Sequence, residues 1–179
     1  DGTGDYLLIP DSPDWDLMNH TNYTAEAWIY PTSVSGVYKI MQQSDDADDN
    51  WNLYQWDDEI ALWCTSGGSA GARFNSTSSP ITINTWQHVA LVKDGNDYEL
   101  FVGGSSVATA TDSTTDTLSA PLYIGHDSSN QDFLGYMDEI RISDSARYTT
   151  TFTPSTTEFT TDANTLLLIH SNWAGGLGA

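Results

Sequence analysis

Asp138 is the residue whose position in the sequence most directly predicts chemistry. Alternate residues of a strand share a face, so Asp138 is expected beside Ile140 and Ile142 on the core side of a strand. A buried carboxylate is costly unless it gains hydrogen-bond donors, a cation or a metal ion. Two interpretations follow: Asp138 accepts backbone N–H groups at a loop, or it binds a structural Ca²⁺ ion.

Pairs of carboxylates could also serve catalysis. Retaining hydrolysis of a sugar bond needs two carboxyl groups about 5 Å apart. In the runs 57–59 and 138–139, neighbouring acids point to opposite faces of a strand or sit in a turn. The sequence also lacks a G-x-S-x-G elbow, an H-E-x-x-H pair and a phosphate-binding glycine loop. It therefore predicts no catalytic residues and a protein that is not an enzyme.

Residues 51–64 read as a hairpin that carries the side chains best suited to sugar binding. Strand alternation places Tyr54 and Trp56 on one face, and Trp63 opposite the aliphatic residues of its own strand. Aromatic rings stack on the apolar faces of pyranoses, while polar neighbours fix the hydroxyl groups. We predict a carbohydrate-binding site at Tyr54, Trp56 and Trp63 with Asn52, and Gln55 or the nearby acids as further polar candidates. The alternative is that these rings fill the protein core.

The charge of the chain excludes several kinds of partner. Its 179 residues include 25 acidic and 5 basic ones, a net charge of -20. Nucleic-acid backbones and anionic membrane surfaces both attract clustered Lys and Arg, so neither is expected as a partner. Hard cations such as Ca²⁺ suit so much carboxylate. The alternative is that an acidic surface simply keeps the protein soluble, for instance in a salty medium.

Length and composition predict one domain of a longer polypeptide. A chain of this length forms a single domain with a sizeable core. Cys64 is the only cysteine, so an internal disulfide is excluded, and no apolar run reaches the roughly 18 residues of a membrane span. The chain starts without Met and ends in a glycine-rich stretch. We predict a domain over residues 1–172 and a linker over residues 173–179.

Short strands separated by turns are expected to position these side chains. No long apolar pattern with a 3.6-residue period occurs, and Thr, Ser, Asp and Gly interrupt each short apolar run. This pattern predicts an all-β sandwich or barrel. The expected strands are residues 5–10, 24–30, 37–43, 51–56, 60–64, 86–94, 98–102, 122–125, 137–142 and 165–170, and residues 67–79 are expected to form a polar loop.

Five segments carry a family resemblance that covers nearly the whole chain. In order they read DGTGDYLLIP, TAEAWIYP, WQHVALVKDGNDYELFVGG, LYIG and GYMDEIRIS. Together they resemble the laminin-G-like domains of the concanavalin A-like lectin and glucanase group. The resemblance implies a jelly-roll sandwich of two antiparallel sheets, one of them concave. Glycoside hydrolases of that group carry a Glu-x-Asp-x-x-Glu strand pattern, which this sequence lacks.

The resemblance also implies where calcium would bind. In the group, a structural Ca²⁺ often sits where the N-terminal strand meets the strand that carries an Asp like Asp138. By resemblance, Asp138 supplies a carboxylate and the first turn supplies oxygens through Asp1, Gly2 or Asp5. Two rival acidic sites are the run of Asp residues within 45–49 and the pair Asp127 and Asp132.

The C-terminal part suggests a setting for the domain. The segments SARYTTTFTPST and TLLLIHSN are similar to versions found in structural and tail-associated proteins of bacteriophages. We therefore expect a non-catalytic adhesion or decoration module on a virion surface, which binds glycan or neighbouring virion proteins and whose oligomeric state is open. The main alternative is a carbohydrate-binding module or adhesin of a bacterial extracellular protein. A glycoside hydrolase is the weaker alternative.

Overall fold

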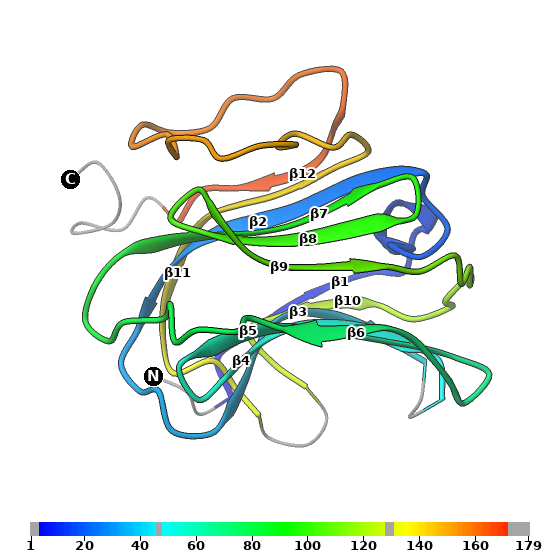
Figure 1. Cartoon of the computed structure of the whole chain (residues 1–179), viewed down its shortest axis with the longest axis horizontal. Helices are drawn as coiled ribbons and strands as arrows, with labels where there is room; N and C mark the ends of the chain where they lie inside the picture. The colour runs from blue at the N-terminus through cyan, green and yellow to red at the C-terminus, as the bar shows by residue number, and fades with distance from the viewer. Residues whose placement is uncertain (1–3, 46–47, 128–130, 172–179) are drawn as a thin grey trace.

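Two antiparallel sheets stacked face to face form the molecule, as Figure 1 shows. The computed structural model describes residues 4–45, 48–127 and 131–171. Within them, sheet A has six strands in the order β1 (Leu7–Ile9), β10 (Leu122–Ile124), β3 (Val37–Ser44), β4 (Asn50–Trp56), β5 (Glu59–Ser66) and β6 (Ser69–Asn75). Sheet B, also of six described strands, has the order β12 (Thr165–Ile169), β11 (Gly135–Ser143), β2 (Asn22–Pro31), β7 (Gln87–Asp94), β8 (Asp97–Val102) and β9 (Ser105–Thr111). The predicted all-β sandwich is confirmed.

The core lies between the two sheets and is filled by alternate residues of each strand. Trp51 and Leu53 of β4 point inward and are fully buried, as are Ala27 and Ile29 of β2. The Trp51 indole donates its N–H to the backbone oxygen of Trp15, 2.8 Å away. Burying one large apolar side chain stabilises a fold by about 1.5–3 kcal/mol. Because Trp51 and Leu53 of β4 point inward, the side chains at the even positions of β4 point to the outer face of sheet A.

A covering segment, residues 144–164, lies over part of the outer face of sheet B. Figure 1 places it on the side of sheet B that faces away from sheet A. Within it, the rings of Tyr148 and Phe152 stack with their centroids 3.6 Å apart. They pack on Phe101 and Val92, which point outward from β8 and β7. The outer face of sheet B is therefore partly occupied by the chain itself.

A β-bulge in β11 overturns the predicted face of Asp138. Asp138 pairs with Trp28, whose ring lies on the outer face of sheet B, since it belongs to none of the residues that fill the space between the sheets. The register then shifts, and Glu139 has a positive φ of 51°. An extra residue in one strand reverses which of the following side chains face the core. The prediction that Asp138 shares a face with Ile140 and Ile142 is therefore wrong.

Two strands were not expected from the sequence. Residues 67–79, predicted as a polar loop, contain β6, and β9 was not predicted at all. Both are edge strands rich in Ser, Thr, Ala and Gly, so they lack the apolar alternation of the central strands. One 3-10 turn, η1 (Pro13–Trp15), precedes β2, and no helix of the described residues is long and apolar enough to span a membrane.

Candidate functional site

A hollow of about 380 Å³ opens on the outer face of sheet A. Tyr54, Trp56, Trp63 and Asn52, the four residues predicted to bind carbohydrate, all line it. Asn52 pairs with Trp63 across β4 and β5, and Tyr54 and Trp56 follow Asn52 at two-residue steps. Neighbouring strands lie about 4.8 Å apart, so this register brings the four side chains within reach of one small ligand. Their role in binding stays a prediction.

The two indoles of the hollow are accessible, whereas its floor is buried. Trp56 is 49% exposed and Trp63 is 41% exposed. Tyr54 and Asn52 are each 7% exposed. Trp56 and Trp63 therefore do not fill the core of the sandwich, which was the alternative interpretation of these rings. The rings of Trp56 and Trp63 are partly open to solvent, and the buried side chains of Tyr54 and Asn52 lie beneath them.

Polar groups surround the aromatic rings. The Asn52 amide nitrogen donates to the side-chain oxygen of Asn50, 2.8 Å away, which leaves the Asn52 oxygen directed to other partners. Lys39 lies above the ring of Tyr54, with its ammonium nitrogen 4.8 Å from the ring centroid. Gln131 completes this side of the hollow. The arrangement offers a carbonyl oxygen, an ammonium group and an amide beside the rings.

Two cations flank the hollow. Burial lowers the pKa of the Lys39 ammonium, and the carboxylate of Asp127, 3.8 Å away, opposes part of that shift. The guanidinium of Arg73 on β6 lies 3.9 Å from the centroid of the Trp63 ring, in a cation–π contact. Arg73 is exposed, and it also donates a long hydrogen bond to the backbone oxygen of Cys64.

Gln55 does not belong to the site. Its position at an odd residue of β4 directs it inward, and it is fully buried. Its amide nitrogen donates to the backbone oxygens of Ser33 and Asp57, at 2.9 and 2.7 Å. Gln55 therefore fixes the loops at one end of the sheet. The expectation that it contacts sugar is wrong, because strand parity places it on the core side.

The acidic run 57–59 forms the turn between β4 and β5. Asp57 has a positive φ of 52°, and its carboxylate accepts the N–H of Gly36 at 2.9 Å. Glu59 accepts a short hydrogen bond from the amide of Asn75 on β6. These carboxylates hold the turn and the neighbouring edge strand, which gives each of them a structural role next to Trp56.

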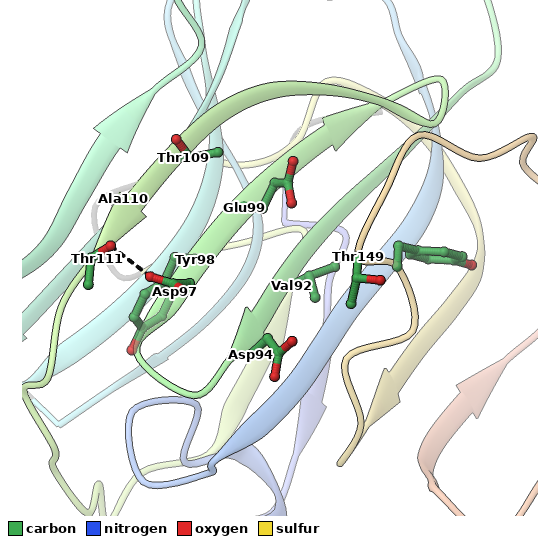
Figure 2. Close-up of a pocket in the computed structure, with 10 residues that line it drawn as sticks. Val92, Asp94, Asp97, Tyr98, Glu99, Thr109, Ala110, Thr111 and Thr149 are labelled. Carbon is green, nitrogen blue, oxygen red and sulfur yellow. Dashed lines mark hydrogen bonds between the residues drawn. The ribbon is translucent and has the colours of Figure 1, made fainter.

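A larger hollow, of about 580 Å³, lies on the outer face of sheet B beside the covering segment (Figure 2). Its lining includes the carboxylates of Asp94, Asp97 and Glu99, and Asp97 accepts a hydrogen bond from Thr111 at 2.7 Å. The ring of Tyr148 at its border is already stacked within the covering segment. This hollow thus offers acidic groups without an accessible aromatic face, and it suits a sugar less well than the hollow on sheet A.

Comparison with known families agrees with this architecture. A family model described as the concanavalin A-like lectin/glucanases superfamily, Laminin_G_3, matches residues 1–151. The chain belongs to this superfamily. No curated protein sequence matches the chain. The association with bacteriophages suggested by residues 145–172 stays a prediction, because the family description does not address it.

Solved structures similar to this concanavalin A-like domain include three bacterial ones. A protein from Bacteroides ovatus described as a candidate carbohydrate-binding protein is 18% identical, with a TM-score of 0.67 over 94% of this chain and 50% of its own. Domain 4 of the extracellular arabinanase AbnA from Geobacillus stearothermophilus, in complex with arabinotriose, is 21% identical, with a TM-score of 0.59 over 76% and 65%. The CBM40 of a Ruminococcus gnavus sialidase, bound to α2,3-sialyllactose, is 15% identical, with a TM-score of 0.53 over 68% and 72%. The chain thus spans about half the length of the Bacteroides ovatus protein. At these identities the likeness shows a shared fold.

Asp138 accepts two backbone N–H groups in this concanavalin A-like domain. Its Oδ1 lies 2.8 Å from the amide nitrogen of Glu139 and 2.9 Å from that of Ser171. The residue is 3% exposed. These contacts match the first interpretation of Asp138, in which the carboxylate anchors a loop. They tie the segment that follows β12 to β11.

The described residues add no further candidate calcium ligands to Asp138. In residues 4–45, 48–127 and 131–171, no three His, Cys, Asp or Glu side chains group in a way that could hold a metal ion. Asp5 is exposed, and Asp1 and Gly2 lie outside the described residues. The two hydrogen bonds described for Asp138 both reach its Oδ1. Calcium at Asp138 stays a prediction from the family resemblance.

The rival acidic sites have protein partners. Asp132 pairs with His126 through a short hydrogen bond, and Asp127 pairs with Lys39. Asp45 accepts a backbone N–H at 2.8 Å, and residues 46 and 47 lie outside the described part of the chain. Because these carboxylates bind groups of the chain itself, they connect loops at the edges of sheet A.

Sequence reasoning missed a buried cluster of charges beneath the covering segment. Glu26 of β2 is fully buried, and its two oxygens accept hydrogen bonds from Arg141 at 2.7 Å, Tyr148 at 2.7 Å and His88 at 2.9 Å. Burial alone would raise the pKa of the Glu26 carboxyl, but the bond from His88 and the charge of Arg141 lower it overall. The only signal was an acid inside the apolar stretch TAEAWIY. The cluster attaches the covering segment to sheet B.

Proposed function

We propose that this domain is a non-catalytic carbohydrate-binding module, and that it binds glycan on the outer face of sheet A. The observation that carries the proposal is the convergence of Trp56, Trp63, Tyr54 and Asn52 around one hollow on the outer face of sheet A. Exposed aromatic rings beside hydrogen-bonding side chains are what a sugar requires, because its ring faces are apolar and its rim is hydroxylated.

Each part of the hollow has a role in this proposal. The exposed faces of Trp56 and Trp63 stack on sugar rings. The Asn52 oxygen accepts a hydrogen bond from a sugar hydroxyl, and the Lys39 ammonium donates one. Because Lys39 and Asn52 are largely buried, they lose little conformational freedom when a ligand binds, which favours affinity.

Of the two settings expected from the sequence, this proposal adopts the second, a carbohydrate-binding module of a bacterial extracellular protein. Its support is the likeness to the arabinanase domain, which is part of an extracellular enzyme and holds arabinotriose, and to the sialidase CBM40, which holds sialyllactose. Placement on a virion surface, with neighbouring virion proteins as partners, is the second setting and rests on the resemblance of residues 145–172 alone. The same hollow would bind host or environmental glycan in either setting.

The absence of catalysis is part of the proposal. Within the described residues, Asp57 and Glu59 hold the β4–β5 turn and the β6 edge, Asp127 pairs with Lys39, and the lining of the hollow contains no carboxylate. Retaining hydrolysis needs two carboxyl groups about 5 Å apart across the sugar bond. We therefore expect binding without turnover, even though the superfamily includes glucanases.

A glycan array with the purified domain tests this proposal. The wild type is expected to bind a defined set of glycans, and Trp63→Ala or Trp56→Ala to lower affinity about tenfold or more, which corresponds to about 1.4 kcal/mol. Tyr136→Ala is the matched control, because Tyr136 is 48% exposed and lies on β11 of sheet B. Binding that survives both tryptophan substitutions, or an absence of glycan binding by the folded protein, would refute the proposal.

A further inference from the structure

A row of side chains crosses the outer face of sheet A from one edge to the other. The strand register pairs Leu8 with Tyr123, Tyr123 with Gln42, Gln42 with Asn52, Asn52 with Trp63, and Trp63 with Arg73. We call these six residues the cross-strand row. Paired residues of antiparallel strands point to the same side of the sheet, so the row runs from Trp63 and Asn52, which line the hollow, to Gln42, Tyr123 and Leu8 beyond it.

The far end of the row is a second aromatic group. Tyr123 lies 6.1 Å from Tyr6 and 5.7 Å from His126, measured between ring centroids. Tyr6 and His126 are stacked, with their centroids 4.3 Å apart. Leu8, the partner of Tyr123 on the edge strand, is 52% exposed. Apolar and aromatic surface therefore stands at both ends of the row, at Trp63 and at Tyr123.

The middle of the row contains the amide of Gln42, to which no hydrogen bond from the described residues is assigned. Gln42 is 4% exposed. The next residue, Gln43, points inward and donates to Asp16 and to the backbone oxygen of Ala120. The Gln42 amide is not among the buried polar groups that lack a partner, so it keeps access to solvent and can exchange a water for a ligand hydroxyl. Together with the Asn52 oxygen, it provides hydrogen-bonding capacity that a ligand on this face would use.

We propose that the cross-strand row is the path of the ligand, and that the domain binds a linear oligosaccharide, or an inner stretch of a polysaccharide, laid across the strands. This inference rests on the proposed function and extends it to the class of glycan. The path from Trp63 on β5 to Tyr123 on β10 crosses three strand intervals, about 14 Å at about 4.8 Å each. That length exceeds one sugar ring. A single terminal sugar would fill the hollow at Trp56 and Trp63 and leave Gln42 and Tyr123 without a role.

The contacts assign a task to each section of the path. Trp56 and Trp63 stack on sugar rings at one end, and Tyr123 stacks on a ring at the other. Between them, Gln42 and Asn52 exchange hydrogen bonds with hydroxyl groups, which fixes the register of the chain. Affinity should consequently rise with the number of sugar units until the ligand reaches Tyr123, and then level off.

Oligosaccharide series of increasing length test this inference. The probes are gluco-, xylo-, manno- and arabino-oligosaccharides of one to six units, titrated into the protein by calorimetry. In the series that binds, affinity is expected to rise at least tenfold between the dimer and the tetramer. Tyr123→Ala should lower affinity for the tetramer about tenfold and for the dimer less than twofold, since each tenfold change corresponds to about 1.4 kcal/mol.

A second variant and a control keep the test independent of folding. Gln42→Met retains the shape of the side chain and removes its hydrogen-bonding groups, so it should lower affinity for the tetramer about fivefold, a change of about 1 kcal/mol. Tyr136→Ala on sheet B should change nothing. Melting curves of all variants check that they fold.

The outcomes separate this inference from the proposed function. Two results would refute the claim that the ligand follows the cross-strand row. One is an affinity that does not depend on oligosaccharide length. The other is an affinity that is unchanged in Tyr123→Ala and lost in Trp63→Ala, and either result leaves the hollow at Trp63 as the binding site. Binding through Trp63 to glycans outside the four linear series overturns the assigned class of glycan. Absence of binding to every probe and to the glycan array overturns both proposals.

Discussion

Trp63 keeps its ring at the surface of sheet A, and Arg73 contributes to holding it there. The guanidinium lies 3.9 Å from the ring centroid, a contact worth about 0.5–1 kcal/mol at an exposed site. Because Arg73 is the register partner of Trp63, the contact follows directly from the strand pairing. A ring that is fixed before the ligand arrives loses less freedom on binding than a mobile one.

Arg73→Ala is therefore expected to weaken glycan binding about threefold to fivefold, a cost of about 1 kcal/mol. Stability should fall by no more than about 1 kcal/mol, because the residue is exposed and its contact with Trp63 contributes about 0.5–1 kcal/mol. Titration calorimetry and urea melts of the same preparation measure the two quantities. Arg73→Lys serves as the comparison, since it keeps the charge but not the planar group. Full affinity in Arg73→Ala would contradict this role.

Asp138 supports a second prediction at the residue scale, which concerns metal removal. If calcium binds there as the family resemblance implies, Ca²⁺ raises the melting temperature of the wild type, by the equivalent of about 2.7 kcal/mol at a hundredfold excess over Kd. EDTA removes that gain, and Asp138→Ala no longer responds to either reagent. Equal melting temperatures of the wild type in Ca²⁺ and in EDTA would refute calcium binding and leave Asp138 as an acceptor for the amides of Glu139 and Ser171.

At the scale of elements, the covering segment depends on the carboxylate of Glu26. Its oxygens accept hydrogen bonds from Arg141, His88 and the half-buried Tyr148, and Glu26 itself is fully buried. Removing one partner of a buried charged group typically costs about 3–5 kcal/mol. Glu26→Gln should destabilise the fold by an amount of this order and make the covering segment more sensitive to proteolysis. The matched control is Glu99→Gln, on the same sheet outside the cluster.

The stability that Glu26 contributes depends on pH with a definite sign. The folded-state pKa of its carboxyl is lowered from the ordinary value of 4.5, so the contribution is fully present above that value. It is lost as the pH falls below 4.5 and through the folded-state pKa. Thermal melts of the wild type and Glu26→Gln should therefore differ most near pH 7 and converge in acid. A gap that widens as the pH falls would be the opposite result.

The elements also explain how far the sequence could predict this molecule. Strand alternation was enough to place Trp56 and Trp63 on one face, because β4 and β5 are regular and their partners Leu53 and Leu62 are apolar. It failed at Asp138, because a bulge leaves no mark in the pattern of apolar residues. It could not reveal that Gln42 and Tyr123 join the same face, since pairing between β3 and β10 is set by the fold of the whole chain.

At the scale of the whole molecule, the two outer faces of the sandwich differ in how the chain covers them. The covering segment and the Glu26 cluster cover part of sheet B and leave an acidic hollow beside them, whereas sheet A presents exposed rings above buried amides. In this arrangement sheet B supports the fold, and sheet A carries the proposed binding site. The boundaries of the domain at residues 172 and 173 stay a prediction, because residues 172–179 lie outside the described part of the chain.

The net charge of -20 predicts how the whole molecule responds to salt. Like charges repel across the compact state, and salt screens them over a Debye length that falls from about 30 Å at 0.01 M to about 3 Å at 1 M. The melting temperature should rise by a few degrees, roughly 2–5 °C, between these concentrations of NaCl, while affinity for a neutral glycan changes little. A melting temperature that falls with salt would contradict this expectation.

The most direct test of the central claim is an NMR titration that follows the indole N–H signals while a glycan from the array is added. The account predicts that the signals of Trp56 and Trp63 shift with the ligand, and that those of the buried Trp15, Trp28 and Trp51 do not. The shifts should saturate at the affinity measured by calorimetry. Saturable shifts confined to residues of sheet B, with Trp56 and Trp63 unmoved, would contradict the claim that sheet A binds the glycan.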